Sequence, residues 1–214
     1  MKTSMRNALF IVSGLIAGFA LCCLLNVAGL LPFADGRAYP EECKVLADSP
    51  LLSALNVARC IKEDDFSGLG DMIHPEKGVA FTPMSTVDPE NDLTFSAAAV
   101  SAFETDKQLY LWGVADGEGA PIRMTPLDYM RRYVGDRDYV RAPITSVGFV
   151  VRTGNREENV LDVFPKSDYV FVELHIPQLD PKWEGMDWSS LKVVFAEYSG
   201  ELKVVALIHS EWTM

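Results

Sequence analysis

The sequence lacks every short motif that would commit it to a known reaction or metal. It has no HExxH, HxxxH or EF-hand spacing, and no GxSxG, GxGxxG or Walker loop. Histidine is scarce, with three residues in 214, and no cysteine has a CxxC partner. The sequence alone therefore predicts no cofactor, no metal and no catalytic residue, and it favours a protein that is not an enzyme.

Positive charge is also in short supply. The chain has 19 lysines and arginines against 30 aspartates and glutamates, which gives a formal net charge of −11 at pH 7. A protein this acidic repels phosphate backbones. Nucleic acid is therefore excluded as an expected partner.

The longest run without any charge lies near the N-terminus, over residues 8–33, and it follows Lys2 and Arg6. It exceeds the roughly 18–20 apolar residues that cross a bilayer and the roughly 7–15 of a signal-peptide core. Positive charges before the run favour a cytoplasmic N-terminus. We expect residues 1–33 to be a signal anchor that holds the protein in the cell membrane. Alternatively, they are a cleaved signal peptide, and the protein is secreted or periplasmic.

The cysteines agree with export. Cys22 and Cys23 lie in the apolar leader, where the preceding residues fit a lipidation site poorly. In an oxidising compartment the other two, Cys43 and Cys60, are most simply a disulfide. The alternative is two free, buried thiols.

The rest of the chain predicts one α+β domain. Residues 34–48 have Pro, Gly and charges without periodicity and indicate a linker, so the domain covers residues 49–214. Helices are predicted from Ser49-Pro50, over 66–73, in a small segment around 96–103 and from Thr125-Pro126. Strands are predicted over 78–81, 107–114, 121–124, 144–152, 169–176, 191–198 and 202–209. Helices followed by a mostly antiparallel sheet are typical of α+β proteins.

The last two strands also predict a register. A two-residue turn at Ser199-Gly200 pairs Tyr198 with Glu201, Phe195 with Val204, and Leu191 with Ile208. One face then holds Leu191, Val193, Phe195, Leu202, Val204, Ala206 and Ile208, whereas Lys192 and His209 share the other, mixed face. We therefore expect helices to cover one face of the sheet.

Candidate site residues are few. Glu173 and His175 share a strand face and could form an acid–base pair, and Asp187 is a further carboxylate for such a role. Aromatic residues at strand ends could rim a pocket or form the outer core. The candidate pocket residues are Tyr110, Trp112, Glu173, His175, Asp187, Trp188, His209 and Trp212.

Four stretches resemble a family of uncharacterised bacterial exported proteins, many of them lipoproteins. They are HPEKGVAFTP (74–83), WGVADGEGAP (112–121), GMDWSSL (185–191) and IHSEWT (208–213). The resemblance implies a fold similar to the nuclear transport factor 2-like and cystatin-like cone, in which a curved sheet wraps a long helix and often leaves a pocket. It implies no catalytic residue.

These observations favour a non-enzymatic module of the bacterial cell envelope that binds a small ligand or an envelope protein. One alternative is a pocket enzyme, a hydrolase or isomerase with a Glu/His or Asp/His pair. The other is a structural module that forms a homodimer through the mixed face of the sheet.

Overall fold

The computed structural model describes residues 49–116 and 119–213. The predicted leader, the linker and Cys43 lie outside these residues. None of the helices in the described ranges combines the length and the hydropathy that a bilayer crossing requires.

The helices are short apart from the first. They are α3 (Pro50–Lys62), α4 (Phe66–Met72), α5 (Ala97–Ser101), α6 (Pro126–Tyr129) and α7 (Val160–Val163), with a π-helical turn η1 (Met130–Val134) and 3-10 turns η2 (Tyr139–Arg141) and η3 (Pro181–Trp183). The predicted cap at Thr125 is confirmed, because its hydroxyl accepts a hydrogen bond from the Asp128 amide. Ser49 occupies the expected position before α3 but makes no side-chain cap bond there.

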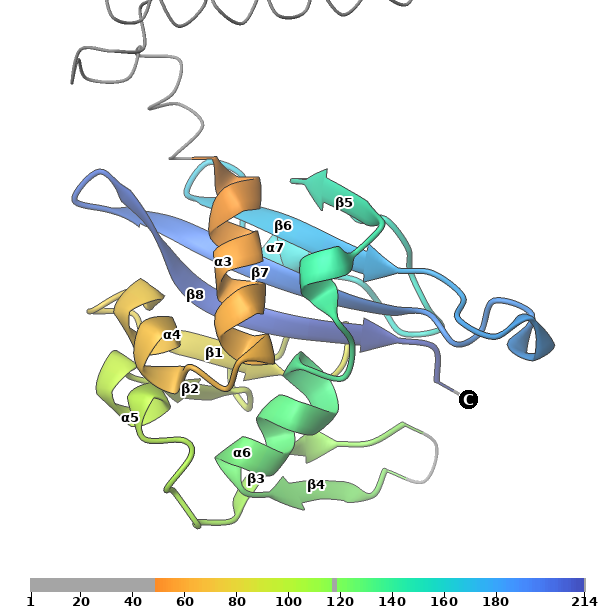
Figure 1. Cartoon of the computed structure of the whole chain (residues 1–214), viewed down its shortest axis with the longest axis horizontal. Coiled ribbons are helices and arrows are strands. Elements are labelled where there is room, and N and C mark those ends of the chain that lie inside the picture. Colours follow the sequence, from red (N-terminus) through yellow and green to blue (C-terminus); the bar gives the residue numbers. More distant parts are fainter. Residues whose placement is uncertain (1–48, 117–118, 214) are drawn as a thin grey trace, which may run out of the picture. The chain divides into compact units, whose positions relative to one another are not determined.

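Six strands form the main sheet, in the order β2-β1-β8-β7-β6-β5 (Figure 1). They are β1 (Val79–Thr82), β2 (Leu93–Phe95), β5 (Ile144–Val147), β6 (Tyr169–Ile176), β7 (Ser189–Tyr198) and β8 (Glu201–Glu211). All pairs are antiparallel except β1 with β8. A separate hairpin joins β3 (Tyr110–Val114) and β4 (Pro121–Met124). The predicted α+β class with a mostly antiparallel sheet is therefore confirmed.

One predicted strand needs correction, and one strand was missed. The strand expected over 144–152 ends at Val147, because Gly148 turns the chain with a φ of +71°. The short strand β2 was not predicted from the sequence, since its three residues follow directly on a polar loop.

The β7–β8 hairpin follows the predicted register only near its turn. Ser199 and Gly200 both have positive φ, as a type I′ turn requires, and Phe195 pairs with Val204 as expected. The register then shifts by one residue at a bulge, so Val194 pairs with Ala206 and Leu191 pairs with His209. The predicted pairing of Leu191 with Ile208 is wrong for this reason.

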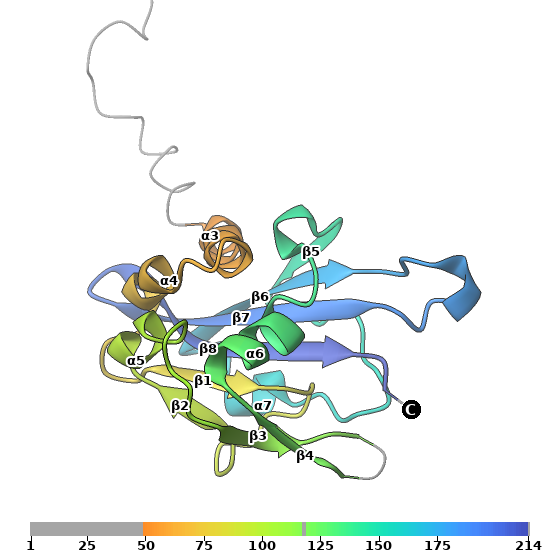
Figure 2. The ribbon, with the colours of Figure 1, turned by 60° about the horizontal axis from the view of Figure 1, so that its bottom comes forward.

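Because of the bulge, each side chain of β8 after Val205 lies on the sheet face opposite to the one that the predicted register gives it. Leu207 packs in the larger core cluster, on the face covered by α3, α4 and α6, whereas Ala206 and Ile208 pack in a second cluster with residues of α7. Figure 2 shows α7 on the side of the sheet opposite to α3. His209 therefore lies on the helix-covered face and not on the mixed face where the straight register would put it.

The larger cluster is rich in aromatic rings. The Phe81 ring lies 5.7–5.9 Å from the ring centroids of four aromatic neighbours, which are Phe95, Phe103, Trp112 and Tyr129. Three of these four contacts are edge-to-face, the geometry that aromatic quadrupoles favour. This cluster joins β1, β2, α5, the β3–β4 hairpin and α6.

We predict that Phe81→Ala destabilises the fold by about 3–5 kcal/mol, because it opens a cavity at the centre of this cluster. The matched control is Phe149→Ala, since the Phe149 side chain is 69 % exposed and should cost less than about 1 kcal/mol. Urea unfolding of both variants checks the difference. Equal midpoints would contradict the central role of Phe81.

Candidate functional site

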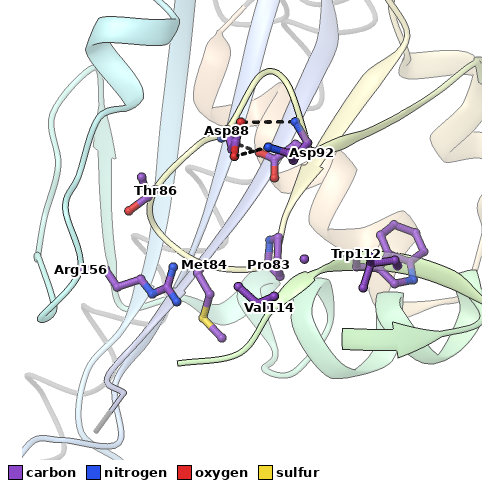
Figure 3. A pocket seen from close by; sticks show the side chains of 11 residues that line it. Pro83, Met84, Thr86, Asp88, Asp92, Trp112, Val114 and Arg156 are labelled. Atoms are coloured by element: carbon purple, nitrogen blue, oxygen red, sulfur yellow. Dashed lines mark hydrogen bonds between the residues drawn. The ribbon is translucent and has the colours of Figure 1, made fainter. Parts of the chain in front are cut away.

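A pocket of about 360 Å³ lies between the loop that follows β1 and the first strand of the β3–β4 hairpin (Figure 3). Its lining residues are Pro83, Met84, Thr86, Asp88, Asn91, Asp92, Leu111, Trp112, Gly113, Val114 and Arg156. Figure 3 shows Asp88 and Asp92 on one side of the pocket, the polar wall, and Pro83, Met84 and Val114 on the other, the apolar wall. Its volume falls within the roughly 300–1,000 Å³ typical of small-molecule sites.

Local sequence explains how the pocket forms. Pro83 ends β1, because it has no N–H for the sheet. Gly113 has a φ of +139°, and a Cβ at that position would meet Pro83 Cγ at 3.3 Å. Glycine therefore lets β3 approach Pro83 closely at the register irregularity between Leu111 and Val114.

Asp92 is the partly buried carboxyl of the polar wall. Its Oδ2 accepts hydrogen bonds from Thr82 Oγ1 at 2.5 Å and from the Asp88 amide at 3.0 Å. Burial raises the pKa of Asp92 above its usual value, despite these two hydrogen bonds. Asp88 instead caps its own turn by accepting from Asn91 Nδ2 at 2.8 Å, and Arg156 forms an ion pair with Asp116. Neither of the two pocket acids, Asp88 and Asp92, therefore pairs with a cationic side chain among the described residues, and Asp92 is the more buried of the two.

A second polar cluster lies on the helix-covered face, at the ends of β7 and β8. Ser189 Oγ lies 2.5 Å from Tyr139 Oη, 2.9 Å from Asp136 Oδ2 and 3.3 Å from His209 Nε2. Tyr139 Oη also donates to Asp136 Oδ1 at 2.7 Å, and His209 Nδ1 donates to the Pro83 carbonyl at 3.0 Å. Pro83 thus links this cluster to the pocket.

The environment of Asp136 favours its ionised form. Burial alone would raise the pKa of this carboxyl, but hydrogen bonding to His209 and its charge, together with the hydroxyls of Tyr139 and Ser189, lower it below the usual value. Burial and the Asp136 charge raise the pKa of Tyr139, which therefore stays a hydroxyl donor at neutral pH. The cluster consequently presents a buried carboxylate beside an imidazole.

The opposite face of the sheet holds a buried ion pair. Lys192 is fully buried, and its Nζ lies 2.7 Å from Glu158 Oε2 and 2.8 Å from Ser210 Oγ. Glu173 is also buried and occupies the β6 position opposite Lys192 in the strand register, while its Oε2 accepts from the Val151 amide at 2.8 Å. Residues 151–158 thus supply partners to the polar groups on this face.

His175 lies in the same region. Its Nδ1 lies 2.7 Å from Ser190 Oγ, and its ring centroid lies 5.7 Å from that of Trp188. Burial lowers the pKa of His175, and the charges of Arg152 and Lys192 lower it further. A neutral imidazole is therefore the favoured form in the folded protein.

The eight predicted pocket residues do not gather at one place. Glu173 and His175 lie on the sheet face opposite to His209, and Trp188 packs against His175. Asp187 lies in a loop, where it accepts hydrogen bonds from the backbone N–H groups of Leu179 and Asp180. Tyr110 and Trp112 belong to the aromatic cluster, and the Trp112 N–H donates to the Met124 carbonyl at 3.0 Å. Trp212 is 38 % exposed. Among the eight, Trp112 alone lines the pocket described above.

Cys60 is buried in α3 and is free among the described residues, with its Sγ 4.0 Å from Asp65 Oδ2. Burial, followed by the Asp65 charge, raises the pKa of its thiol, so the reactive thiolate is disfavoured. The predicted bridge to Cys43 concerns a residue outside the described ranges and remains a prediction.

Sequence reasoning missed the residues that the structure brings together here. Asp136, Tyr139 and Ser189 are separated by up to 53 positions, and none belongs to a recognisable motif. The spacing of Asp88 and Asp92 around Pro89 was a signal for a structured acidic turn, but not for a pocket.

We predict that acidification destabilises the protein partly through His175. Because the folded pKa is below the unfolded value of about 6.5, the unfolded chain binds more protons, and stability falls as pH drops below that value. Urea unfolding at pH 7.5 and pH 5.5 should show a smaller pH effect for His175→Gln than for the unchanged protein. An identical pH effect in both proteins would refute this role. Carboxylates with lowered pKa lose their contribution only at lower pH.

Comparisons with known proteins give limited similarity. No family model matches the chain, and no curated protein matches it. The solved structures that overlap include Aln2 from a Streptomyces species, with 11 % identity, 82 % of this chain and 94 % of that chain covered, and a TM-score of 0.35. An NTF2-like protein with a cystatin-like fold from Novosphingobium aromaticivorans shows 10 % identity, coverages of 79 % and 85 %, and a TM-score of 0.35.

A third overlapping structure comes from Streptomyces avermitilis and is proposed to be a dehydratase of the NTF2-like family. It has 11 % identity, coverages of 76 % and 94 %, and a TM-score of 0.36. Two of these descriptions name the fold group that the sequence resembles. Overlaps with TM-scores of 0.35–0.36 do not by themselves assign a fold. The α+β class therefore rests on the strand order and helix packing described above.

Proposed function

We propose that the domain is a non-enzymatic binding module whose site is the pocket between the β1–β2 loop and β3. The observation that carries this proposal is the pairing of an apolar wall with a polar wall in one open pocket of about 360 Å³. Both walls are built from loop and hairpin residues, the parts of a fold where binding sites are most often found.

The lining residues indicate the chemistry of the ligand. Leu111, Val114 and Met84 offer apolar surface beside Trp112, which suits an aliphatic or aromatic body. Asp92 faces this surface and suits a hydroxyl or amine donor. We therefore expect a small amphipathic molecule with a donor group at one end.

The acid–base pairs expected for an enzyme receive less support. Glu173 and His175 are both buried, and each already has a hydrogen-bond partner in Val151 or Ser190. Asp187 accepts two backbone N–H groups. None of these three residues lines the pocket, so a hydrolase or isomerase reaction there would have to use other groups.

We propose further that the module works outside the cytoplasm, held in the membrane by residues 1–33. The support is the uncharged run over residues 8–33, preceded by Lys2 and Arg6. A small ligand or an envelope protein would then be the natural partner, and the acidic body would keep the domain away from anionic headgroups.

The ligand is tested by native mass spectrometry of the full chain, purified gently in mild detergent. We predict an added mass of roughly 100–400 Da, the range of small pocket ligands. Leu111→Trp should reduce its occupancy at least about tenfold, because a larger side chain at a lining position takes up pocket volume.

The matched control is Leu109→Trp. Leu109 is 64 % exposed and lies outside the pocket, whereas Leu111 is 45 % exposed and lines it. Equal loss of the added mass in both variants would contradict the assignment of the pocket. A bare monomer would favour a protein partner, and a bare dimer would favour the structural alternative.

Membrane attachment has a separate test. We predict that the mature protein keeps its N-terminus and stays with the membrane fraction after a high-salt wash, because an apolar span and not charge would hold it there. Substituting Leu15 and Ile16 by Arg should release it into the soluble fraction or prevent export. An N-terminus beginning beyond residue 33 would instead establish a cleaved signal.

A further inference from the structure

Three potential metal-ligating atoms converge at the ends of η1 and β8. Asp136 Oδ2 lies 3.7 Å from His209 Nε2, and Glu211 Oε2 lies 4.0 Å from the same nitrogen. All three atoms lie within 4.8 Å of one another. His209 and Glu211 are two positions apart on β8, so both side chains point to the helix-covered face.

The surrounding groups orient these atoms. His209 Nδ1 donates to the Pro83 carbonyl, so in the neutral ring the lone pair lies on Nε2 and faces the two carboxylates. Metal-binding histidines almost always have such a partner on the second nitrogen. Arg132 Nη2 contacts Glu211 Oε1 at 2.8 Å, which leaves Glu211 Oε2 directed toward His209.

No neighbouring hydroxyl among the described residues has a proton left to donate to His209 Nε2. Tyr139 donates to Asp136 Oδ1, and Ser189 donates to Asp136 Oδ2. Each hydroxyl has a single proton, so neither remains for His209 Nε2. His209 is buried and the two carboxylates are partly buried, and three acceptor atoms that face one another in such a position are unfavourable unless a cation or an additional proton lies between them.

We propose that Asp136, His209 and Glu211 bind a divalent transition-metal ion, with Zn²⁺ as the best match. One imidazole and two carboxylates are ligands that zinc accepts at about 2.0–2.2 Å. Two carboxylate charges also balance a dication, whereas pure oxygen sites, typical of Mg²⁺ and Ca²⁺, have no imidazole.

The distances leave room for the ion. Tetrahedral ligands at zinc bond lengths lie about 3.3–3.5 Å apart, so the three atoms would move inward by a fraction of an ångström. Asp136 also lines a surface hollow of about 390 Å³ together with Arg137 and Asp138, and the Glu211 side chain is 18 % exposed, so two of the three ligands lie at the protein surface. Ser189, beside the centre, would stay bonded to Asp136 as an outer partner.

The competing occupant is a proton on His209 Nε2, which would make an imidazolium between the two carboxylates. Both occupants satisfy the same three atoms, so geometry alone allows either. They differ in stoichiometric metal uptake, which the imidazolium does not predict. Metal binding is therefore the measurement that separates them.

The test uses the full chain, purified in mild detergent without a histidine tag and stripped with a chelator. Zn²⁺ is titrated against a chromophoric chelator, and we expect one ion per chain. Glu211→Gln and Asp136→Asn should each weaken binding by more than about 10- to 100-fold, the loss seen when even outer partners of a metal are removed. Glu211→Gln is the safer variant because this side chain is partly exposed.

Asp138→Asn is the matched control, since Asp138 lies two residues from Asp136 and pairs with Lys62 instead. It should bind Zn²⁺ like the unchanged protein, with circular dichroism confirming that all variants are folded. The absence of stoichiometric uptake would overturn the proposal in favour of the imidazolium. Equal affinity in Glu211→Gln and Asp138→Asn would also overturn it.

X-ray absorption at the zinc edge supplies a second readout. We expect nitrogen and oxygen neighbours with the scattering pattern of one imidazole. Sulfur among the neighbours would assign the ion to cysteine and overturn the site. Because none of the three residues lines the ligand pocket, loss of zinc and loss of the pocket ligand are separable outcomes.

Discussion

The bulge at Val205 is the constraint on which the arrangement of the polar groups depends. It shifts the pairing of β8 with β7 by one residue, so every side chain from Ala206 to Glu211 takes the face opposite to the one that straight pairing would give. Ile208 and Ala206 then fill the cluster beside α7, and Leu207 enters the main core. One inserted residue thus places apolar side chains of β8 in the hydrophobic layers on both faces of the sheet and directs His209 toward Asp136.

Each face of the sheet combines an apolar layer with a buried polar group near the same end of the strands. On one face Lys192 depends on Glu158 and Ser210, and on the other His209 depends on Asp136 and Ser189. Removing one partner of a buried ion pair costs about 3–5 kcal/mol, so the Lys192–Glu158 pair fastens the segment that carries Glu158 to the sheet. The hydrogen bonds from Tyr139 and Ser189 to Asp136 fasten the segment after η1 in the same way. The polar clusters therefore tie loops to strands in a way that the hydrophobic layers alone do not.

The pocket has a different origin. It lies at the edge of the aromatic cluster, where Trp112 closes the core on one side and faces the β1–β2 loop on the other. The Pro83 carbonyl accepts a hydrogen bond from His209, so a movement of the pocket loop at Pro83 would alter a hydrogen bond of the polar cluster. A proposed ligand site and a proposed metal site thus share one proline while using different side chains.

Turns, helix starts and the α+β class followed from the sequence by itself, because each depends on neighbours in the chain. Ser199-Gly200 specifies its turn through backbone conformation, Thr125-Pro126 starts its helix through a hydroxyl and a fixed φ, and alternation reveals the long strands. The face taken by His209, the burial of Lys192 and the meeting of Asp136 with Ser189 were decided by the tertiary structure alone. A bulge arises where one of two paired strands has an extra residue, and a buried polar cluster forms where segments distant in the sequence meet. Neither leaves a periodic pattern in the residues of one strand.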